Sequence, residues 1–192
     1  ISNFLQNLSI KTIIDVGAHK GEFAQNALKI KSVNKIISFE PQKKIFKILK
    51  EKFENNDRIS LNNFALSEKV EKKIMKINKM TATSTLNHEI NNDSLYFKFK
   101  SFLLYQKNSI VSEEEIYPAT FDIFFNQEKF DQNTLLKIDT EGYEIHVLKG
   151  SNQKIKEIKY ILIENQFSNM YKNVKFKDCH KFLEDKNFKL LK

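Results

Sequence analysis

The chain has 192 residues, a length that suits one domain with a substantial hydrophobic core. Hydrophobic residues account for 41% and charged residues for 29%, proportions that are typical of soluble globular proteins. No apolar run approaches the roughly 20 residues that span a membrane, and no secretory signal is visible, so we expect a cytoplasmic location. Cys179 is the only cysteine, which excludes an intrachain disulfide and favours a reducing compartment. Because the first residue is Ile1 rather than methionine, we expect a trimmed or mature form of the chain.

The net charge of +8 raises the question of a nucleic-acid partner. Arg58 is the only arginine, however, and lysine supplies the rest of the positive charge. Arginine is the side chain best suited to hold phosphates and guanine edges, so its near absence argues against specific nucleic-acid binding. We therefore interpret the charge as a lysine-rich, solvated surface.

The first part of the chain alternates short apolar runs with amphipathic ones. Thr12–Val16 is a β-branched run followed by glycine, which predicts a buried strand. Glu22–Ile30 follows as a helix, and Lys35–Phe39 is a second strand that ends before Pro41. Gln42–Phe53 then has apolar residues at helical spacing, with lysines on the opposite side.

The middle of the chain is less regular. Ile59–Leu66 predicts a third strand, and Val70–Ile77 alternates apolar and polar residues as a half-exposed strand. Residues 81–117 show no regular pattern, and we interpret them as a variable lid or insertion within a single domain spanning 1–192. Regular elements return in the order helix, strand, helix, strand, helix and the start of a last strand, at Phe121–Phe125, Thr134–Ile138, Glu144–Lys149, Tyr160–Ile163, Asp178–Asp185 and Phe188–Leu191.

Strands separated by helices form βαβ units, and these build a parallel sheet covered by helices on both faces. In such α/β folds, ligands bind beyond the carboxyl ends of the strands, near the point where the strand order reverses. Candidate site residues are therefore those at the predicted strand ends: Asp15–Gly17, Glu40, Ala65, Asp139–Glu141 and Glu164.

Two of these strand ends suggest a nucleoside ligand. The sequence DVGAHKGEF follows the first strand, and its Gly17 and Gly21 allow a tight turn and a close approach of the backbone to a ligand. The spacing is not G-x-G-x-x-G, so the usual dinucleotide cradle is incomplete. Glu40 ends the next strand, where a carboxylate accepts hydrogen bonds from the ribose of a nicotinamide cofactor or of S-adenosylmethionine (SAM). Together these features favour a nucleoside site over a structural turn.

The stretch KIDTEGYE at 137–144 gathers three carboxylates behind an apolar run. A solvated turn, a metal site and a reaction centre are all compatible with it, and a helix dipole favours acids there even without chemistry. Asp139, Glu141 and Glu164 offer the oxygen ligands that a divalent cation prefers. A histidine-based metal site is not expected, because no close ligand pairing is found among His19, His88, His146 and His180.

Six motifs in one order, DVGAHKGEF, SFEP, NNFALS, ATFD, LLKIDTEGYEIHVLKG and ILIE, resemble the FkbM family of SAM-dependent methyltransferases. The resemblance covers roughly Thr12 to Glu164. It implies a Rossmann-like three-layer α/β sandwich with a mostly parallel central sheet. It also implies methyl transfer from SAM to an acceptor hydroxyl, commonly on a sugar, a polysaccharide or a glycosylated metabolite. The sheet of this class ends in an antiparallel hairpin, so either its last strand follows Lys192 or the sheet is truncated.

The resemblance also assigns roles to particular residues. Asp139 and Glu141 would face the sulfonium and the acceptor. Asp15, Gly17 and Gly21 would surround the methionine part of SAM, Glu40 would hold the ribose, and Ala65 with Leu66 would lie near the adenine. The implied cofactor set, besides Asp139, is Asp15, Gly17, Ala18, His19, Gly21, Glu40, Ala65 and Leu66.

Methyl transfer to an alcohol needs in-line positioning and a base within hydrogen-bond reach of the hydroxyl. Our hypothesis is that Asp139 and Glu141 work at the reaction centre, while Glu144 caps and solvates the following helix. His19 and Glu164 are further candidates for the base. A divalent cation held by Asp139, Glu141 and Glu164 is the less favoured alternative.

Other interpretations stay open at this point. The aromatic stretch 95–105 predicts either a lid that stacks on a sugar acceptor or a helix packed against the sheet or a second subunit, so a homo-oligomer is compatible with the sequence. An NAD-dependent oxidoreductase is one alternative function, against which the missing G-x-G-x-x-G counts. A catalytically silent Rossmann-like binding module is another, against which the joint presence of Gly17, Glu40, Asp139 and Glu141 counts.

Overall fold

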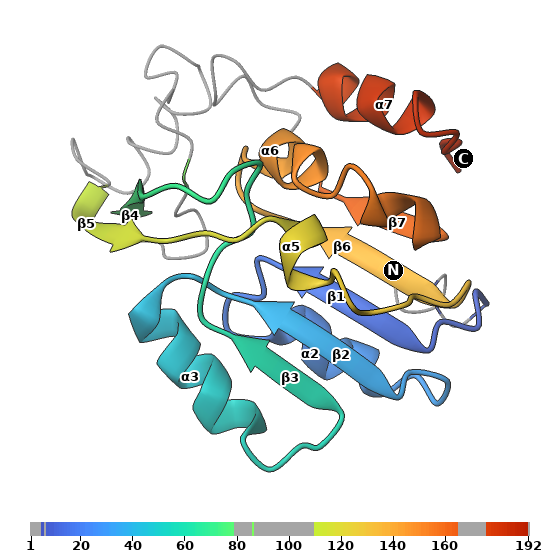
Figure 1. Cartoon of the computed structure of the whole chain (residues 1–192). Coiled ribbons are helices and arrows are strands. Elements are labelled where there is room, and N and C mark those ends of the chain that lie inside the picture. The colour runs from blue at the N-terminus through green and yellow to red at the C-terminus, as the bar shows by residue number, and fades with distance from the viewer. Residues whose placement is uncertain (1–4, 6, 79–85, 87–109, 165–175, 192) are drawn as a thin grey trace, which may run out of the picture.

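The computed structural model describes all residues except 1–4, 6, 79–85, 87–109, 165–175 and 192 (Figure 1). Its centre is a five-stranded sheet in the order β3-β2-β1-β6-β7, and every neighbouring pair of strands in it is parallel. The strands are β1 (Thr12–Val16), β2 (Lys35–Phe39), β3 (Ile59–Asn62), β6 (Thr134–Ile138) and β7 (Tyr160–Ile163).

Helices cover the sheet on both faces, because neighbouring residues of each strand point to opposite sides and both sets are apolar. Ile13 and Leu135 pack under α2 (Glu22–Ala27) and α3 (Lys43–Phe53). Ile14 and Leu136 belong to the core of the other face, together with residues of four short helices. These are α5 (Phe121–Phe124), α6 (Glu144–Lys149), the 3-10 helix η2 (Lys154–Glu157) and α7 (Phe176–Glu184). The predicted three-layer α/β sandwich is confirmed, and its strand order is that of a Rossmann-like sheet.

The strand order reverses between β1 and β6. The chain builds β1, β2 and β3 outward in one direction and then returns to the other side of β1 for β6 and β7 (Figure 1). In the β1–β6 pair, Asp15 is opposite Lys137 and Val16 is opposite Ile138. The carboxyl ends of β1 and β6 therefore lie side by side at the switch point, where ligands bind in open α/β sheets.

The expectation that all of 81–117 is irregular is wrong at its carboxyl end. Ile110–Ile116 forms β5, which pairs antiparallel with β4 (Lys73–Asn78) in a separate two-stranded ribbon. The acidic triplet within β5 hides its strand pattern in the sequence, but an ion pair with Lys72 accommodates Glu115. Apart from Leu86, residues 81–109 are not among those described, and the predicted aromatic lid at 95–105 falls within that range.

Other predicted strands also differ in their bounds, and β4 begins at Lys73 rather than Val70. The third strand ends at Asn62 rather than Leu66, because the Asn63 amide donates to the carbonyl oxygens of Glu40 (2.8 Å) and Pro41 (3.2 Å) and redirects the chain. Leu66 instead makes an isolated bridge with Ala119.

The strand expected at 188–191 does not form. Asn187 has a left-handed backbone (φ 67°), and the N–H of Phe188 donates to the carbonyl of Leu183 at 3.0 Å. This hydrogen bond and the left-handed Asn187 are the features of a Schellman motif, which ends the helix and turns Phe188 back onto α7. Within the part of the chain that the structure describes, no strand follows β7, and no helix is long and apolar enough to span a membrane.

Candidate active site

A cavity of about 450 Å³ opens at the carboxyl ends of β1, β2 and β6. Its size is that of a small-molecule or cofactor site. Most residues predicted for the site line it: Gly17, Ala18, His19, Glu40, Ala65, Leu66, Asp139 and Glu141. Two predicted residues do not line it, since Asp15 is fully buried and Gly21 caps α2.

Residues 17–21, called the glycine turn below, follow β1 and bend sharply. Gly17 has φ 81°, and its N–H and that of Ala18 both donate to the Phe39 carbonyl at 3.0 Å. A Cβ on Gly17 would lie 1.8 Å from the carbonyl oxygen of Asp139, and a Cβ on Gly21 (φ 77°) would lie 2.3 Å from a ring atom of Phe53. Both glycines are therefore required by backbone conformation and by protein packing. The prediction that they make room for a ligand has no support in these contacts.

Glu40 joins the end of β2 to the glycine turn. Its Oε2 accepts a hydrogen bond from the backbone N–H of His19 at 2.9 Å, and its Oε1 accepts one from the N–H of Gln42 at 2.8 Å. The residue is only 3% exposed. Burial raises the pKa of Glu40 to about 7, although the two backbone N–H groups oppose this rise. A carboxyl group held in this way faces the cavity with lone pairs left to accept further hydrogen bonds.

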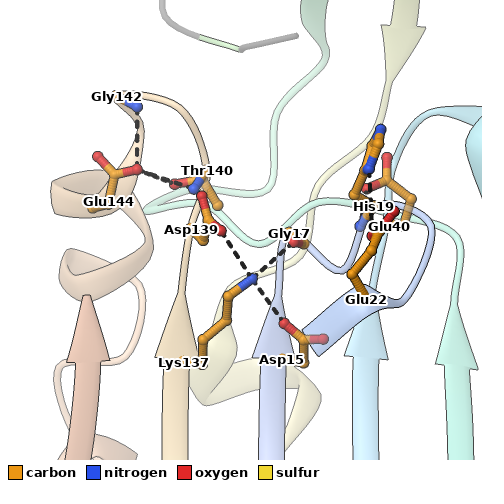
Figure 2. Close-up of polar contacts among 10 residues, drawn as sticks. All are labelled: Asp15, Gly17, His19, Glu22, Glu40, Lys137, Asp139, Thr140, Gly142 and Glu144. Carbon is orange, nitrogen blue, oxygen red and sulfur yellow. Dashed lines mark hydrogen bonds and ion pairs between the residues drawn. The ribbon is translucent and has the colours of Figure 1, made fainter. Parts of the chain in front are cut away.

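Lys137 is a polar residue in a strand whose other members are apolar or hydroxylated, and it lies at the centre of the site (Figure 2). Its Nζ lies 3.0 Å from Oδ1 of Asp15 and 3.3 Å from Oδ2 of Asp139, and it donates to the carbonyl oxygen of Gly17 at 3.0 Å. Burial by itself would lower the pKa of Lys137, but the charges of Asp15 and Asp139 outweigh it and raise the pKa above its ordinary value. The ammonium is therefore charged at neutral pH.

Asp15 is the most deeply buried acid of the site, with no exposed surface. Burial raises the pKa of Asp15, and the charge of Lys137 opposes the rise. The contact with Lys137 is an ion pair, and Oδ2 of Asp15 has no hydrogen-bond partner among the described residues. Asp15 therefore acts on the cavity through Lys137 and the glycine turn above it.

Residues 139–142, called the acidic turn below, follow β6 with an unusual backbone. Glu141 (φ 53°) and Gly142 (φ 88°) are both left-handed. Oε1 of Glu144 accepts hydrogen bonds from the N–H groups of Thr140 (3.0 Å) and Gly142 (3.1 Å) and from the Thr140 hydroxyl (3.1 Å) (Figure 2). Glu144 is 2% exposed, so the expectation that it is solvated on its helix is wrong. It holds the turn that carries Asp139 and Glu141 into the cavity.

A family model described as "Methyltransferase FkbM domain" matches residues 15–190 of this chain. The chain belongs to the FkbM methyltransferase family. It is similar to the crystal structure of a methyltransferase FkbM from Methylobacillus flagellatus KT, at 17% sequence identity and a TM-score of 0.48. That match covers 81% of this chain but 32% of the other, so this chain spans about a third of the length of that protein. The search of curated proteins found no match.

Three acids of this FkbM-family chain meet at the cavity. Asp139, Glu141 and Glu164 each offer a carboxylate oxygen within 4.8 Å of the others. Burial raises the pKa of Glu164 to about 7, and a hydrogen bond to Asp139 and the charge of Asp139 add to the rise. Glu164 is therefore partly protonated at neutral pH, with Asp139 beside it. The same three carboxylates have the oxygen ligands that one divalent cation would need, so the metal alternative calls for an experimental test.

Sequence reasoning missed several contributors to the site. Lys137 is the most important of them. The feature that could have identified it is a lysine within an apolar run that predicts a fully buried strand. The cavity also has an apolar wall from β4 and from segments far apart in the chain, which no local pattern identifies: Phe64, Met75, Leu86 and Tyr143. His19, which the sequence did predict for the site, lines the cavity with Nδ1 3.6 Å from Glu22, and burial is the main cause that lowers the pKa of its imidazole.

Proposed function

We propose that this chain transfers a methyl group from SAM to a hydroxyl oxygen of an acceptor, and that the acceptor is a sugar, a polysaccharide or a glycosylated metabolite. The observation that carries the proposal is the meeting of the glycine turn, Glu40 and Asp139 around one cavity in a member of the FkbM family. Membership of the family supports methyl transfer, and the chemistry of the cavity supports SAM as the donor.

The residues present fit the parts of SAM. Glu40 offers a buried carboxyl group that can accept hydrogen bonds from ribose hydroxyls. Phe64, Ala65 and Leu66 give an apolar wall suited to a purine ring. The acids Asp139 and Glu141 complement the positive charge of a sulfonium and an amino group. The same site would suit a nicotinamide dinucleotide less well, since the glycine turn lacks the pyrophosphate cradle.

Bound SAM would supply a methyl group on a positively charged sulfur, which keeps the electron pair of the C–S bond when that bond breaks. The chain has to exclude water, align the acceptor oxygen with the methyl carbon and remove the hydroxyl proton as the new O–C bond forms. Asp139 and Glu141 are the proposed proton acceptors, because both line the cavity on a turn that Glu144 holds in place. Glu164 is the next candidate, since its pKa of about 7 suits a base at neutral pH.

Calorimetric titration with SAM, with its demethylated product and with NAD tests the donor. We expect SAM and the demethylated product to bind with 1:1 stoichiometry and NAD not to bind. Binding of NAD without SAM would overturn the proposal in favour of an oxidoreductase. Binding of none of the three would favour a silent binding module.

Transfer of a labelled methyl group to a panel of mono- and oligosaccharides then tests the acceptor, with simple amines as the contrasting panel. The double variant Asp139→Ala/Glu141→Ala should lose at least about a hundredfold in turnover, as expected for a removed acid–base group. Exposed Glu51→Ala on α3 is the control and should leave turnover unchanged. Intact turnover in a folded double variant would show that the base lies elsewhere.

A further inference from the structure

We propose that Lys137 is a positioning residue, which holds the glycine turn and the acidic turn in one arrangement and so shapes the donor part of the cavity. The two turns come from different strands, β1 and β6, and each supplies residues to the cavity lining. Lys137 itself also lines the cavity, but its Nζ already contacts three oxygen atoms of the protein. The effect on SAM binding depends on the proposed function, whereas the effect on the two turns does not.

The ammonium of Lys137 has three N–H donors, and three acceptors surround it. They are a carboxylate of β1 (Asp15), the carbonyl of the glycine turn (Gly17) and a carboxylate of the acidic turn (Asp139). The side chain is 8% exposed, so water competes little for these contacts. One side chain therefore links three separate segments, through two ion pairs and one charge-assisted hydrogen bond to the Gly17 carbonyl.

The two turns touch directly beside this link. The N–H of Asp139 donates to the carbonyl of Val16 at 3.0 Å, and the backbone of Gly17 lies so close to Asp139 that a Cβ would not fit. A small displacement of either turn therefore moves Gly17 against Asp139. Because both residues line the cavity, such a displacement changes the shape of the donor site.

Stability alone does not explain a lysine at this position. Lys137 lies between Leu136 and Ile138 in a buried strand, directly opposite Asp15 in the register with β1. A buried ion pair is expensive to desolvate, and a pair of well-packed apolar side chains is often as stable. The lysine does provide what an apolar residue would lack, namely a hydrogen bond to the Gly17 carbonyl and an ion pair with Asp139.

Lys137→Met removes the ammonium and keeps an unbranched side chain that is one atom shorter. The matched control is Lys154→Met, because Lys154 is also largely buried (15% exposed) and bonds a carboxylate, Glu157, and a carbonyl, Glu128, outside this cavity. Amide hydrogen exchange is then measured on the chain without any ligand. We expect exchange in residues 17–21 and 139–142 to accelerate at least about tenfold in Lys137→Met, with α3 and β3 unchanged. Lys154→Met should leave exchange in both turns unchanged.

The double variant Asp15→Asn/Lys137→Met removes both buried charges and so protects the test against misfolding caused by an unpaired Asp15. Exchange in both turns should still accelerate, because the link from Lys137 to Gly17 and Asp139 is absent. Unchanged exchange in the two turns of either variant, or acceleration spread evenly over the sheet, would overturn the proposal.

SAM affinity gives the second readout. We expect Lys137→Met to bind SAM at least about tenfold more weakly than the wild-type chain. The double variant should likewise bind SAM at least about tenfold more weakly than Asp15→Asn alone. Equal affinities within either pair would overturn the role of Lys137 in the donor site. If the wild-type chain binds no SAM, the proposed function fails, while the exchange experiment still decides whether Lys137 holds the two turns.

Discussion

The backbone N–H of His19 donates a hydrogen bond to Oε2 of Glu40 across 2.9 Å, and this bond joins the glycine turn to the end of β2. His19 has a left-handed backbone (φ 48°) within this turn. The acid proposed to hold the ribose is thus also part of the framework of the turn. Its ionisation therefore affects both stability and ligand binding.

Glu40 should make the chain less stable as the pH rises from about 4.5 to 7. In the unfolded chain its pKa is the ordinary 4.5, whereas burial raises the pKa in the folded chain to about 7. Over this range the folded chain keeps a proton that the unfolded chain has lost, so the unfolding free energy falls by about 3 kcal/mol. Denaturant unfolding of wild-type and Glu40→Gln chains at pH 5 and pH 8 measures this difference.

Glu40→Gln should remove that part of the pH dependence, leaving the contributions of the other acids whose pKa is raised, Asp15 and Glu164. SAM binding provides an independent check, because ribose hydroxyls donate to the ionised carboxylate better than to the acid. Affinity for SAM should therefore rise between pH 6 and pH 8 in the wild-type chain and rise less in Glu40→Gln, where Glu164 still ionises over this range. An identical pH dependence in the two chains would contradict the assignment.

Gly17→Ala should damage both folding and donor binding. The added Cβ would lie 1.8 Å from the Asp139 carbonyl oxygen, on a backbone with φ 81°. We expect a loss of at least about 2 kcal/mol in unfolding free energy, together with loss of detectable SAM binding. Thermal unfolding and calorimetry measure the two effects.

Gly150→Ala is the matched control for Gly17→Ala. Its Cβ would lie 2.0 Å from the carbonyl oxygen of Ser67, but Gly150 does not line the cavity. It should lose comparable stability and, at a temperature where it is folded, keep most of the SAM affinity. Equal loss of affinity in both variants would show that the effect of Gly17 is not local to the site.

Glu144→Gln should loosen the acidic turn. The wild-type carboxylate accepts three hydrogen bonds, two from backbone N–H groups of Thr140 and Gly142 and one from the Thr140 hydroxyl. Loss of the charge on this buried acceptor should lower the unfolding free energy by about 1–3 kcal/mol and accelerate amide exchange at Gly142. Glu51→Gln, an exposed change on α3, should cost less than about 0.5 kcal/mol. Unaltered exchange at Gly142 would contradict the anchoring role of Glu144.

Asp139→Asn should lower the pKa of Glu164. Burial is the largest cause of its rise to about 7, and the hydrogen bond and charge of Asp139 come next. Removing the charge of Asp139 should therefore bring the pKa of Glu164 down while leaving it above 4.5, because the burial remains. Carboxyl carbon NMR titration of both chains measures the shift. An unchanged pKa of Glu164 would show that Asp139 does not contribute to its rise.

Chelation should leave methyl transfer unchanged. Although Asp139, Glu141 and Glu164 could share a cation, Lys137 already neutralises Asp139 at 3.3 Å, and Glu164 holds a proton near neutral pH. Both features compete with a divalent ion for the same oxygens. Turnover should change less than about twofold after treatment with a chelator. Loss of turnover that added Mg²⁺ restores would establish the metal alternative.

Much of the site follows from local patterns. Thr12–Val16, Lys35–Phe39, Thr134–Ile138 and Tyr160–Ile163 form strands with the predicted bounds, because each is a short apolar run ended by a turn residue. Parallel strands bring their carboxyl ends to one edge, so Gly17, Glu40 and Asp139 meet there as expected. The errors concern segments whose pattern is ambiguous, such as the acidic β5 and the apolar residues after α7.

The sequence by itself determined which residues stand at the strand ends and which family they belong to, because turn chemistry and apolar periodicity are local. Only the tertiary structure decided what those residues do to one another. Lys137 reaches Gly17 across 120 positions of the chain because β6 is the neighbour of β1, and Glu144 is buried with its carboxylate bonded to the acidic turn. Strand neighbours and burial result from the packing of the whole core, so the charge network of this site is a property of the folded chain.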